Sequence, residues 1–248
     1  NEELGIMKRI IIIGATSGIG HEVAKHYIKE GYQVGVAGRR LERLEALQAI
    51  APTQVHIQPI DVTAEAAPAQ LLALIEKLGG MDIFLLCSGI GHQNRCLYQA
   101  IEMDTIETNV KGFTRMVLTA YHYFSGHGGG HIAVISSIAG TKGLGVAPSY
   151  SATKCFQNCY IDALAQLSRI EQRPISFTDI RPGFVRTALL NDGLHYPMCL
   201  SLRYATRLIV EAIDRRKRRA IIDWRYALLV FFWRLIPNWL WERLPIAN

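Results

Sequence analysis

Residues 9–20 decide the fold, and they are Arg9-Ile10-Ile11-Ile12-Ile13-Gly14-Ala15-Thr16-Ser17-Gly18-Ile19-Gly20. The β-branched run up to Ile13 predicts a strand that is buried on both faces. The glycines that follow permit a tight turn and let the backbone approach a ligand closely. A helical pattern then runs over 21–30, so free N–H groups at a helix start would face a bound pyrophosphate. The alternative is an ordinary turn between strand and helix.

The rest of the chain alternates strand and helix patterns in the same way. This alternation predicts a doubly wound α/β fold with a seven-stranded parallel sheet between two layers of helices. No repeat or linker interrupts it, so we expect one domain over 7–223, and residues 1–6 before Met7 read as a cloning remnant. Further strands are expected at 33–37, 55–60, 81–87, 131–135, 175–180 and 220–222, and helices at 41–49, 63–78, 97–103, 109–124, 150–168 and 201–215.

The second strand ends in Gly38-Arg39-Arg40, where dinucleotide folds that use NAD usually carry an acidic residue. A guanidinium can pair with the 2′-phosphate of NADP, so two arginines here favour NADP over NAD. The alternative is that the arginines only open the next helix, which suits Arg40 better than Arg39.

A possible catalytic pair lies in the segment Tyr150-Ser151-Ala152-Thr153-Lys154. On a helix, two residues four positions apart lie on the same face. An ammonium group near a phenol favours the phenolate, so the pKa of Tyr150 is expected to fall toward neutral pH. Such a phenol can give a proton to a carbonyl oxygen or take one from an alcohol. Taken alone, the pattern also fits an exposed amphipathic helix.

These residues resemble the short-chain dehydrogenase/reductase family, and the resemblance runs from about Lys8 to Ile222. Jointly the motifs are specific, and they imply a Rossmann-type fold. The chain departs from the family at Leu86-Cys87-Ser88-Gly89, where Asn-Asn-Ala-Gly is usual, and at Ile13, where Thr is common. The motifs that carry the resemblance are Gly14-x-x-x-Gly18-Ile19-Gly20, Asp61-Val62, Asn109-x-x-Gly112, Ser136-Ser137-x-Ala139-Gly140, Tyr150-x-x-x-Lys154 and Pro182-Gly183-x-x-x-Thr187.

The resemblance implies a role for each of four catalytic residues. Tyr150 would be the acid/base, and Lys154 would lower its pKa and bind the nicotinamide ribose. Ser137 would hold and polarise the substrate carbonyl, and Asn109 would position a water in a proton relay behind Lys154. From the sequence alone, Asn109 could equally be a buried polar residue that hydrogen-bonds the backbone.

The resemblance also implies a set of cofactor contacts. Asp61 could accept a hydrogen bond from the adenine amino group and could also cap the helix that follows, and the two roles are compatible. Thr187 and the backbone near Val185 would bind the carboxamide. The expected cofactor-binding residues are Gly14, Thr16, Ser17, Gly18, Ile19, Gly20, Arg39, Arg40, Asp61, Val62, Ser88, Gly89, Tyr150, Lys154, Pro182, Gly183, Val185 and Thr187.

The expected function is that of an NADP(H)-dependent carbonyl reductase or alcohol dehydrogenase. Between Thr187 and Ser201 the chain is apolar, which suits a hydrophobic substrate or simply a covered core. A catalytically silent NADP(H)-binding regulator or scaffold is the main alternative. A sugar-nucleotide epimerase or dehydratase would need a larger substrate domain. The apolar residues of this region are Leu189, Leu190, Leu194, Tyr196, Met198 and Leu200.

Composition narrows the class of protein further. The chain has 248 residues, 50% of them hydrophobic, and a net charge of +6 that is concentrated in residues 215–219 and in Arg39-Arg40. No nucleic-acid-reading motif accompanies that charge, so no nucleic-acid partner is expected. Five scattered cysteines fit no metal-site spacing and indicate reduced thiols in a cytoplasmic protein. No signal peptide is recognisable.

Residues 224–248 differ from the rest because they are apolar and contain all four tryptophans. The charge-free run between Arg225 and Arg234 is far shorter than the roughly twenty residues that span a bilayer. Tryptophans between arginines suit a helix at a membrane surface, through 224–244. The extension could instead cover the substrate pocket or form a subunit interface. By family resemblance, the long helices starting at Asn109 and Tyr150 would form a homodimer or homotetramer.

Overall fold

The centre of the sheet is β1 (Arg9–Ile13), whose four isoleucines are fully buried. The computed structural model describes residues 8–187 and 196–246. β1 pairs in parallel with β2 (Gln33–Gly38) on one side and β4 (Ile83–Leu86) on the other. The sheet continues through β3 (Val55–Pro59), β5 (Gly130–Ile135), β6 (Ile175–Pro182) and β7 (Arg219–Ile222). The order is β3-β2-β1-β4-β5-β6-β7, and every pairing is parallel, as predicted.

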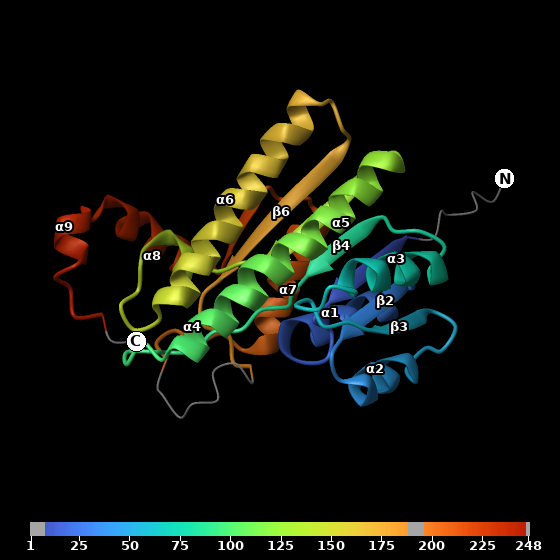
Figure 1. Ribbon diagram of the computed structural model, residues 1–248, viewed down its shortest axis with the longest axis horizontal. Coiled ribbons are helices and arrows are strands. Elements are labelled where there is room, and N and C mark those ends of the chain that lie inside the picture. Colours follow the sequence, from blue (N-terminus) through green and yellow to red (C-terminus); the bar gives the residue numbers. More distant parts are fainter. Residues whose placement is uncertain (1–7, 188–195, 247–248) are drawn as a thin grey trace.

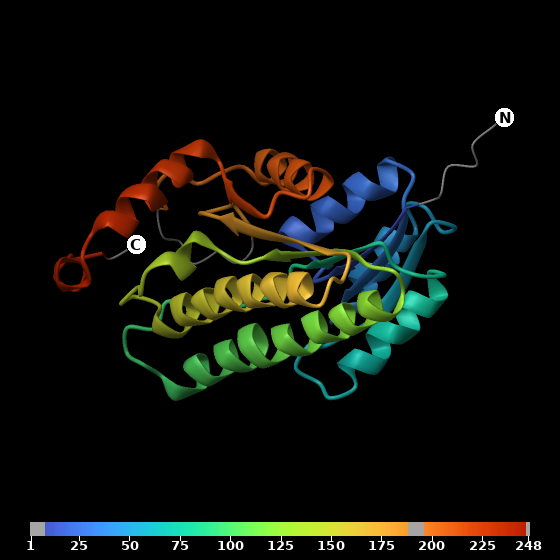
Figure 2. The same cartoon turned by 90° about the horizontal axis from the view of Figure 1, so that it is seen from above.

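Helices cover both faces of this sheet, each over its own hydrophobic core (Figures 1 and 2). One core takes residues from α1 (Gly18–Lys29), α2 (Leu41–Gln48), α7 (Leu202–Asp214) and α8 (Trp224–Leu235). The other takes residues from α3 (Ala67–Lys77), α5 (Phe113–Gly126) and α6 (Pro148–Ile170). The three-layer arrangement predicted from the alternating pattern is therefore confirmed.

Most helix ends shift by a few residues from the prediction, and two helix starts near the site differ for a local reason. α3 begins at Ala67 rather than Thr63, because the Asp61 carboxylate accepts hydrogen bonds from the Thr63 N–H and hydroxyl and holds a turn there. The helix expected at 109–124 is preceded by α4 (Gln99–Ile106) and opens with a π-helical segment, η1 (Glu107–Gly112), before α5. A π-helical turn of this kind often marks a functional site.

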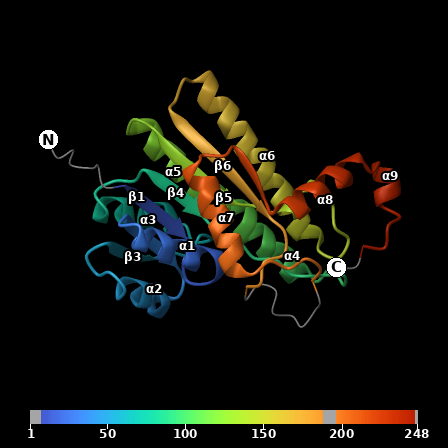
Figure 3. The ribbon, with the colours of Figure 1, turned by 180° about the vertical axis from the view of Figure 1, so that it is seen from behind.

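The order of the strands reverses between β1 and β4. In doubly wound sheets, the carboxyl ends of the strands at such a switch point leave a crevice where ligands bind. The glycine loop after β1 lies at this edge. At the same edge, α8 follows β7, and α8 and α9 (Asn238–Trp241) extend from one end of the molecule (Figures 1 and 3).

Candidate active site

The loop between β1 and α1 is shaped by its glycines. Gly14 and Gly18 have φ values of +91° and +57°, in the left-handed region that disfavours other residues. A Cβ added to Gly14 would lie 2.7 Å from the Ser88 backbone nitrogen, and one added to Gly20 would collide with the Gly14 carbonyl. Ser17 is the N-cap of α1, but its side chain does not cap the helix, and the first turn holds no acidic residue. The helix start can therefore receive an anion.

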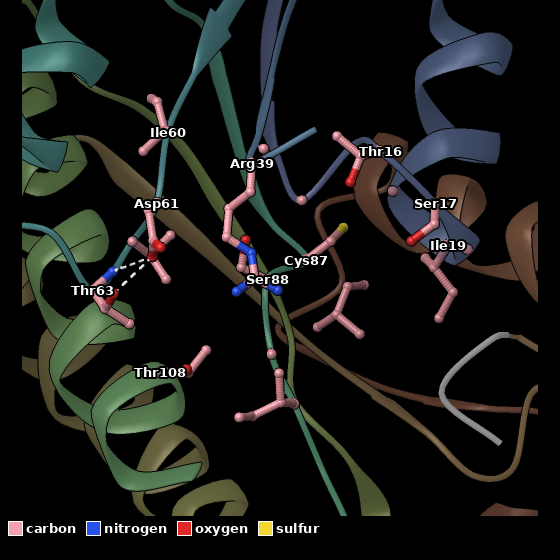
Figure 4. A pocket seen from close by; sticks show the side chains of 18 of the residues that line it. Thr16, Ser17, Ile19, Arg39, Ile60, Asp61, Thr63, Cys87, Ser88 and Thr108 are labelled. Carbon is pink, nitrogen blue, oxygen red and sulfur yellow. Dashed lines mark hydrogen bonds between the residues drawn. The ribbon is translucent and has the colours of Figure 1, made fainter. Parts of the chain in front are cut away.

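A cavity of about 620 Å³ opens over this loop at the carboxyl edge of the sheet (Figure 4). Its wall comes from the ends of β1, β2, β3, β4 and β5, from α1, α4, η1 and α6, and from the segment after β6. Of the predicted residues, those on the wall are Gly14, Thr16, Ser17, Gly18, Ile19, Gly20, Arg39, Arg40, Asp61, Val62, Ser88, Gly89, Tyr150, Lys154 and Thr187.

The two arginines after β2 have different surroundings. Arg40 donates to the hydroxyls of Thr16 and Ser17, at 2.9 and 2.8 Å, so it lies on the glycine loop rather than only opening α2. Arg39 points into the pocket (Figure 4). The pKa of Asp61 lies below its ordinary value. Burial is the largest single effect and raises this pKa, but the hydrogen bonds from Thr63 and the charge of Arg39 together lower it by more. Asp61 closes a turn with Thr63 and is not the N-cap of α3.

Tyr150 and Lys154 lie on the same face of α6, as their spacing predicts. The Lys154 Nζ is 5.8 Å from the centroid of the Tyr150 ring. It donates to the Ile135 carbonyl at 3.2 Å and to Gln157 Oε1 at 3.0 Å. Gly91 lets the Tyr150 ring come close, since an added Cβ would lie 2.5 Å from ring carbon Cδ2. Both side chains face the crevice above the glycine loop.

Burial dominates the proton affinities of this pair. It raises the pKa of Tyr150, and a hydrogen bond with Ser137 offsets this only in part. This is the reverse of the direction expected from the sequence. Burial also lowers the pKa of Lys154 to about 8, against the opposing effect of the Asp179 charge. At neutral pH the phenol is therefore protonated and the amine is still a cation.

Ser137 follows β5 and sits behind the cavity wall next to Tyr150. Its hydroxyl oxygen accepts from the Ala139 N–H at 3.0 Å and caps the short 3-10 turn η2 (Ile138–Thr141). Its hydroxyl also bonds with Tyr150 and points to the Pro182 carbonyl at 3.4 Å. Two hydroxyls thus converge at the end of β5, as a carbonyl-polarising pair requires.

Asn109 is fully buried in η1, and its side chain is bound on both ends. Oδ1 accepts from the Ile90 N–H at 2.9 Å, and Nδ2 donates to the Ile90 carbonyl and to the Thr153 hydroxyl. Its main-chain carbonyl accepts from Gln157 Nε2 at 2.9 Å. The side chain therefore hydrogen-bonds the backbone, as expected of a buried polar residue. The main-chain carbonyl of Asn109 connects to Lys154 through Gln157.

Gln157 is a site residue that the sequence analysis missed. Its amide spans Lys154 and Asn109, accepting from one and donating to the other. It lies three residues after Lys154, so helical spacing puts it on the same side of α6. That spacing could have identified it, but a glutamine in a long helix carries no specific signal.

A second missed group lies on β6, close enough to Lys154 to affect its pKa. Asp179 and Arg181 form a buried ion pair, with Asp179 Oδ2 and Arg181 Nη2 2.6 Å apart. Ser136 donates its hydroxyl to Asp179 as well. The negative charge of Asp179 raises the pKa of Lys154 against the effect of burial. Opposite charges at alternate positions of one strand lie on the same face, and that spacing is the signal that could have found this pair.

The segment after β6 meets the predictions only in part. Pro182, Gly183 and Val185 do not line the described cavity. Pro182 and Val185 are buried, and a Cβ added to Gly183 would collide with the ring of Tyr226. Val185 instead bridges to Leu200, and Leu200 belongs to the core. Leu189, Leu190 and Leu194 lie outside the described residues.

Several cavity residues were not predicted because they lie on neighbouring elements without a motif of their own. Cys87 replaces a usual family residue, and burial raises the pKa of its thiol to about 12, so it is an inert wall group. The other unpredicted wall residues are Gly38, Ile60, Thr63, Ile90, Asp104, Glu107, Thr108, Ile135 and Ser136.

A family model described as short chain dehydrogenase matches residues 8–194. An uncharacterized oxidoreductase of Mycobacterium tuberculosis (strain ATCC 25618 / H37Rv) is 30% identical over 244 residues, covering 93% of this chain and 95% of the relative. The structure of a short chain dehydrogenase/reductase from Burkholderia phymatum in complex with NAD aligns with a TM-score of 0.82 at 19% identity, covering 98% of this chain and 97% of that one. A variant of actinorhodin polyketide ketoreductase with NADPH aligns with a TM-score of 0.75 at 23% identity, covering 87% and 95%.

The sheet order, the glycine loop and the crevice at the switch point define a protein of the doubly wound α/β class. The family model covers most of the chain and so identifies the family within this class. This chain belongs to the short-chain dehydrogenase family and is an oxidoreductase.

Proposed function

We propose that this protein is an NADP(H)-dependent reductase that interconverts a carbonyl and a secondary alcohol on a hydrophobic small molecule. The observation that carries the proposal is the position of Tyr150 and Lys154, which face the cavity that opens above the glycine loop. The fit to a dinucleotide rests on the loop itself, because Gly14 and Gly20 let it pack tightly against the sheet and the start of α1 has neither a side-chain cap nor an acidic residue.

The preference for NADP(H) is supported by the adenosine end of the cavity. Arg39 and Arg40 both line it, and the acidic residue that would hold a ribose hydroxyl in an NAD enzyme is missing at the end of β2. The Arg39 guanidinium would pair with the 2′-phosphate, and Arg40 would support it from the glycine-loop hydroxyls.

In the reductive direction, a bound nicotinamide would supply the hydride to the carbonyl carbon. Tyr150 would donate its hydroxyl proton to the carbonyl oxygen, which becomes the alcohol oxygen. A phenol whose pKa is raised is fully protonated at neutral pH and is thus ready to give a proton. The Ser137 hydroxyl would polarise the same oxygen, and the Lys154 cation would stabilise the phenolate that remains.

The hydrophobic substrate class is supported by the segment after β6. The rings of Phe184 and Tyr196 pack with centroids 4.7 Å apart, and Met198 is partly exposed beside them in sequence. Apolar pocket walls with few polar groups are typical of sites for small apolar ligands.

The experiment is a screen of NADPH oxidation, followed by absorbance, against aromatic, alicyclic and long-chain ketones and aldehydes, with NADH in parallel. We expect turnover of at least one apolar carbonyl, with a higher kcat/KM for NADPH than for NADH. Tight NADPH binding without turnover of any carbonyl or alcohol would instead support a silent NADP(H)-binding protein.

A further inference from the structure

The carboxyl-terminal extension, residues 224–246, presents an apolar face to the outside. On α8, the inward positions Tyr226, Val230 and Trp233 pack against the body of the protein. The opposite positions follow helical spacing and are large and exposed, which is unusual for a helix of a globular protein. These outward residues are Trp224 at 71% exposure, Leu228 at 50%, Phe231 at 58%, Phe232 at 54% and Leu235 at 63%.

The short helix α9 continues this face. Trp239 and Leu240 are exposed by 61% and 37%, whereas Trp241 is buried and packs edge-to-face on Trp233, with ring centroids 5.4 Å apart. The apolar face therefore belongs to a folded unit whose inner side is already occupied. No helix among residues 8–187 and 196–246 is long and apolar enough to cross a membrane.

Hydrogen bonds fix the extension to both loops that flank the catalytic pair. The Tyr226 hydroxyl accepts from the Phe184 N–H at 3.0 Å and can donate to the Met198 carbonyl at 3.1 Å. On the other side, Lys142 donates to the Ile236 carbonyl at 2.9 Å, and the Trp241 indole N–H donates to the Gly143 carbonyl at 2.7 Å. A preformed face costs less ordering entropy on binding than a flexible tail would.

The charges around the face indicate what would cover it. Arg225 pairs with Asp223 just before the extension, so the charges that remain in residues 224–246 are those of Arg234, Arg243 and Glu242, a net charge of +1. Arg234 and Arg243 are exposed and form no ion pair among the described residues. A second copy of the chain would bring these like charges together, whereas an anionic surface would neutralise them.

The basic run at 215–219 is not part of this face. Arg215 and Lys217 pair with Glu211, and Arg218 and Arg219 pair with Asp162. These residues precede or begin β7, whereas α8 begins after that strand ends. The arginines of the extension itself must therefore supply the attraction.

We propose that the extension docks on a membrane surface that contains anionic lipids. The outward face of α8 and the Trp239 side of α9 enter the interface, and Arg234 and Arg243 contact the headgroups. Because the extension is tied to the loops beside Tyr150, docking also brings the carboxyl edge of the sheet to the lipid, where apolar substrates concentrate. The proposal does not depend on the reductase activity.

The test is co-sedimentation of the full chain with phosphatidylcholine vesicles and with vesicles that also contain phosphatidylglycerol. Two double variants are compared with the wild type: Phe231→Ser with Phe232→Ser, and Arg234→Glu with Arg243→Glu. The matched control is Ile170→Ser, which alters a residue that is 71% exposed at the far end of α6. Thermal melting checks that each variant is folded, and sedimentation velocity gives its oligomeric state.

We expect the wild type and Ile170→Ser to bind the anionic vesicles, and added salt to weaken the binding. The phenylalanine variant should lose at least about tenfold in affinity, since two side chains no longer leave water. The arginine variant should lose its preference for anionic vesicles. The proposal is overturned if the wild type binds neither vesicle, if folded variants bind as well as it does, or if the phenylalanine variant changes only the oligomeric state, which would identify a subunit interface.

Discussion

The crevice over the glycine loop and the extension beyond β7 lie along one edge of the sheet but are built in opposite ways. At the crevice, Lys154 and Asn109 are buried and each is held by several partners, as Lys154 is by Gln157 and Ile135. In the extension, large apolar groups are exposed, and a few hydrogen bonds connect the unit to the body. The first arrangement fixes the positions of reacting atoms, and the second leaves a surface for something outside the molecule.

Apart from the loss of the Tyr150 hydroxyl, the largest effect is expected at the adenosine end of the crevice. Arg39→Asp should lower kcat/KM for NADPH by about tenfold to a hundredfold, because it removes charge-assisted hydrogen bonds worth ~1.5–3 kcal/mol. The kcat/KM for NADH should stay the same or rise. Steady-state kinetics with both cofactors measures this, with Arg43→Asp on the exposed side of α2 as the control. An equal loss with both cofactors would remove the argument for NADP(H).

The pH dependence of the crevice should follow Lys154, whose pKa is lowered to about 8 by burial. Below this value the amine is a cation, so the reductive kcat/KM should be level. Above it the amine loses its proton, and kcat/KM should fall by about tenfold per pH unit. Cys87, with a pKa of about 12, cannot produce an inflection there. A profile that stays level up to pH 10 would contradict this assignment.

Gln157 offers a sharper test of the same network, with a smaller effect. Gln157→Leu removes an acceptor from the Lys154 ammonium, so the alkaline limb should move to lower pH and kcat should fall by about fivefold. Gln157→Glu places a negative charge there and should move the limb to higher pH. Opposite shifts in the pH profiles of the two variants indicate a positioning role. Equal shifts would mean that Gln157 only supports the packing of α6.

In the extension, a single hydroxyl group should have the smallest effect. Tyr226→Phe leaves the Phe184 N–H without its acceptor, which should reduce the free energy of unfolding by about 1 kcal/mol. Because Tyr226 touches a substrate-side loop but not the catalytic pair, KM for the carbonyl should change while kcat holds. Thermal melting and kinetics measure both, with Tyr98→Phe as an exposed control. A loss of kcat would mean that the two regions are more closely coupled than the structure indicates.

The sequence predicted the features that depend on local patterns and missed those that depend on contacts between distant segments. Each strand is a short apolar run, so the sheet and its parallel order followed from the pattern. The glycine loop and the Tyr150–Lys154 pair could be predicted because each depends on residues at a fixed local spacing. Gln157, Asp179 and Tyr226 carry no such spacing, since their roles arise from contacts between distant segments. The direction of the Tyr150 pKa was also missed, because burial is a property of the whole fold.

The assignment of chemistry to the crevice depends most directly on the Tyr150 hydroxyl. The decisive measurement is single-turnover reduction of a carbonyl by NADPH with wild-type protein and Tyr150→Phe, alongside the Kd for NADPH. The account predicts that the rate falls by at least about a hundredfold, the usual contribution of a positioned proton donor, while the Kd stays nearly the same. A variant that binds NADPH and reduces the carbonyl at close to the wild-type rate would contradict it.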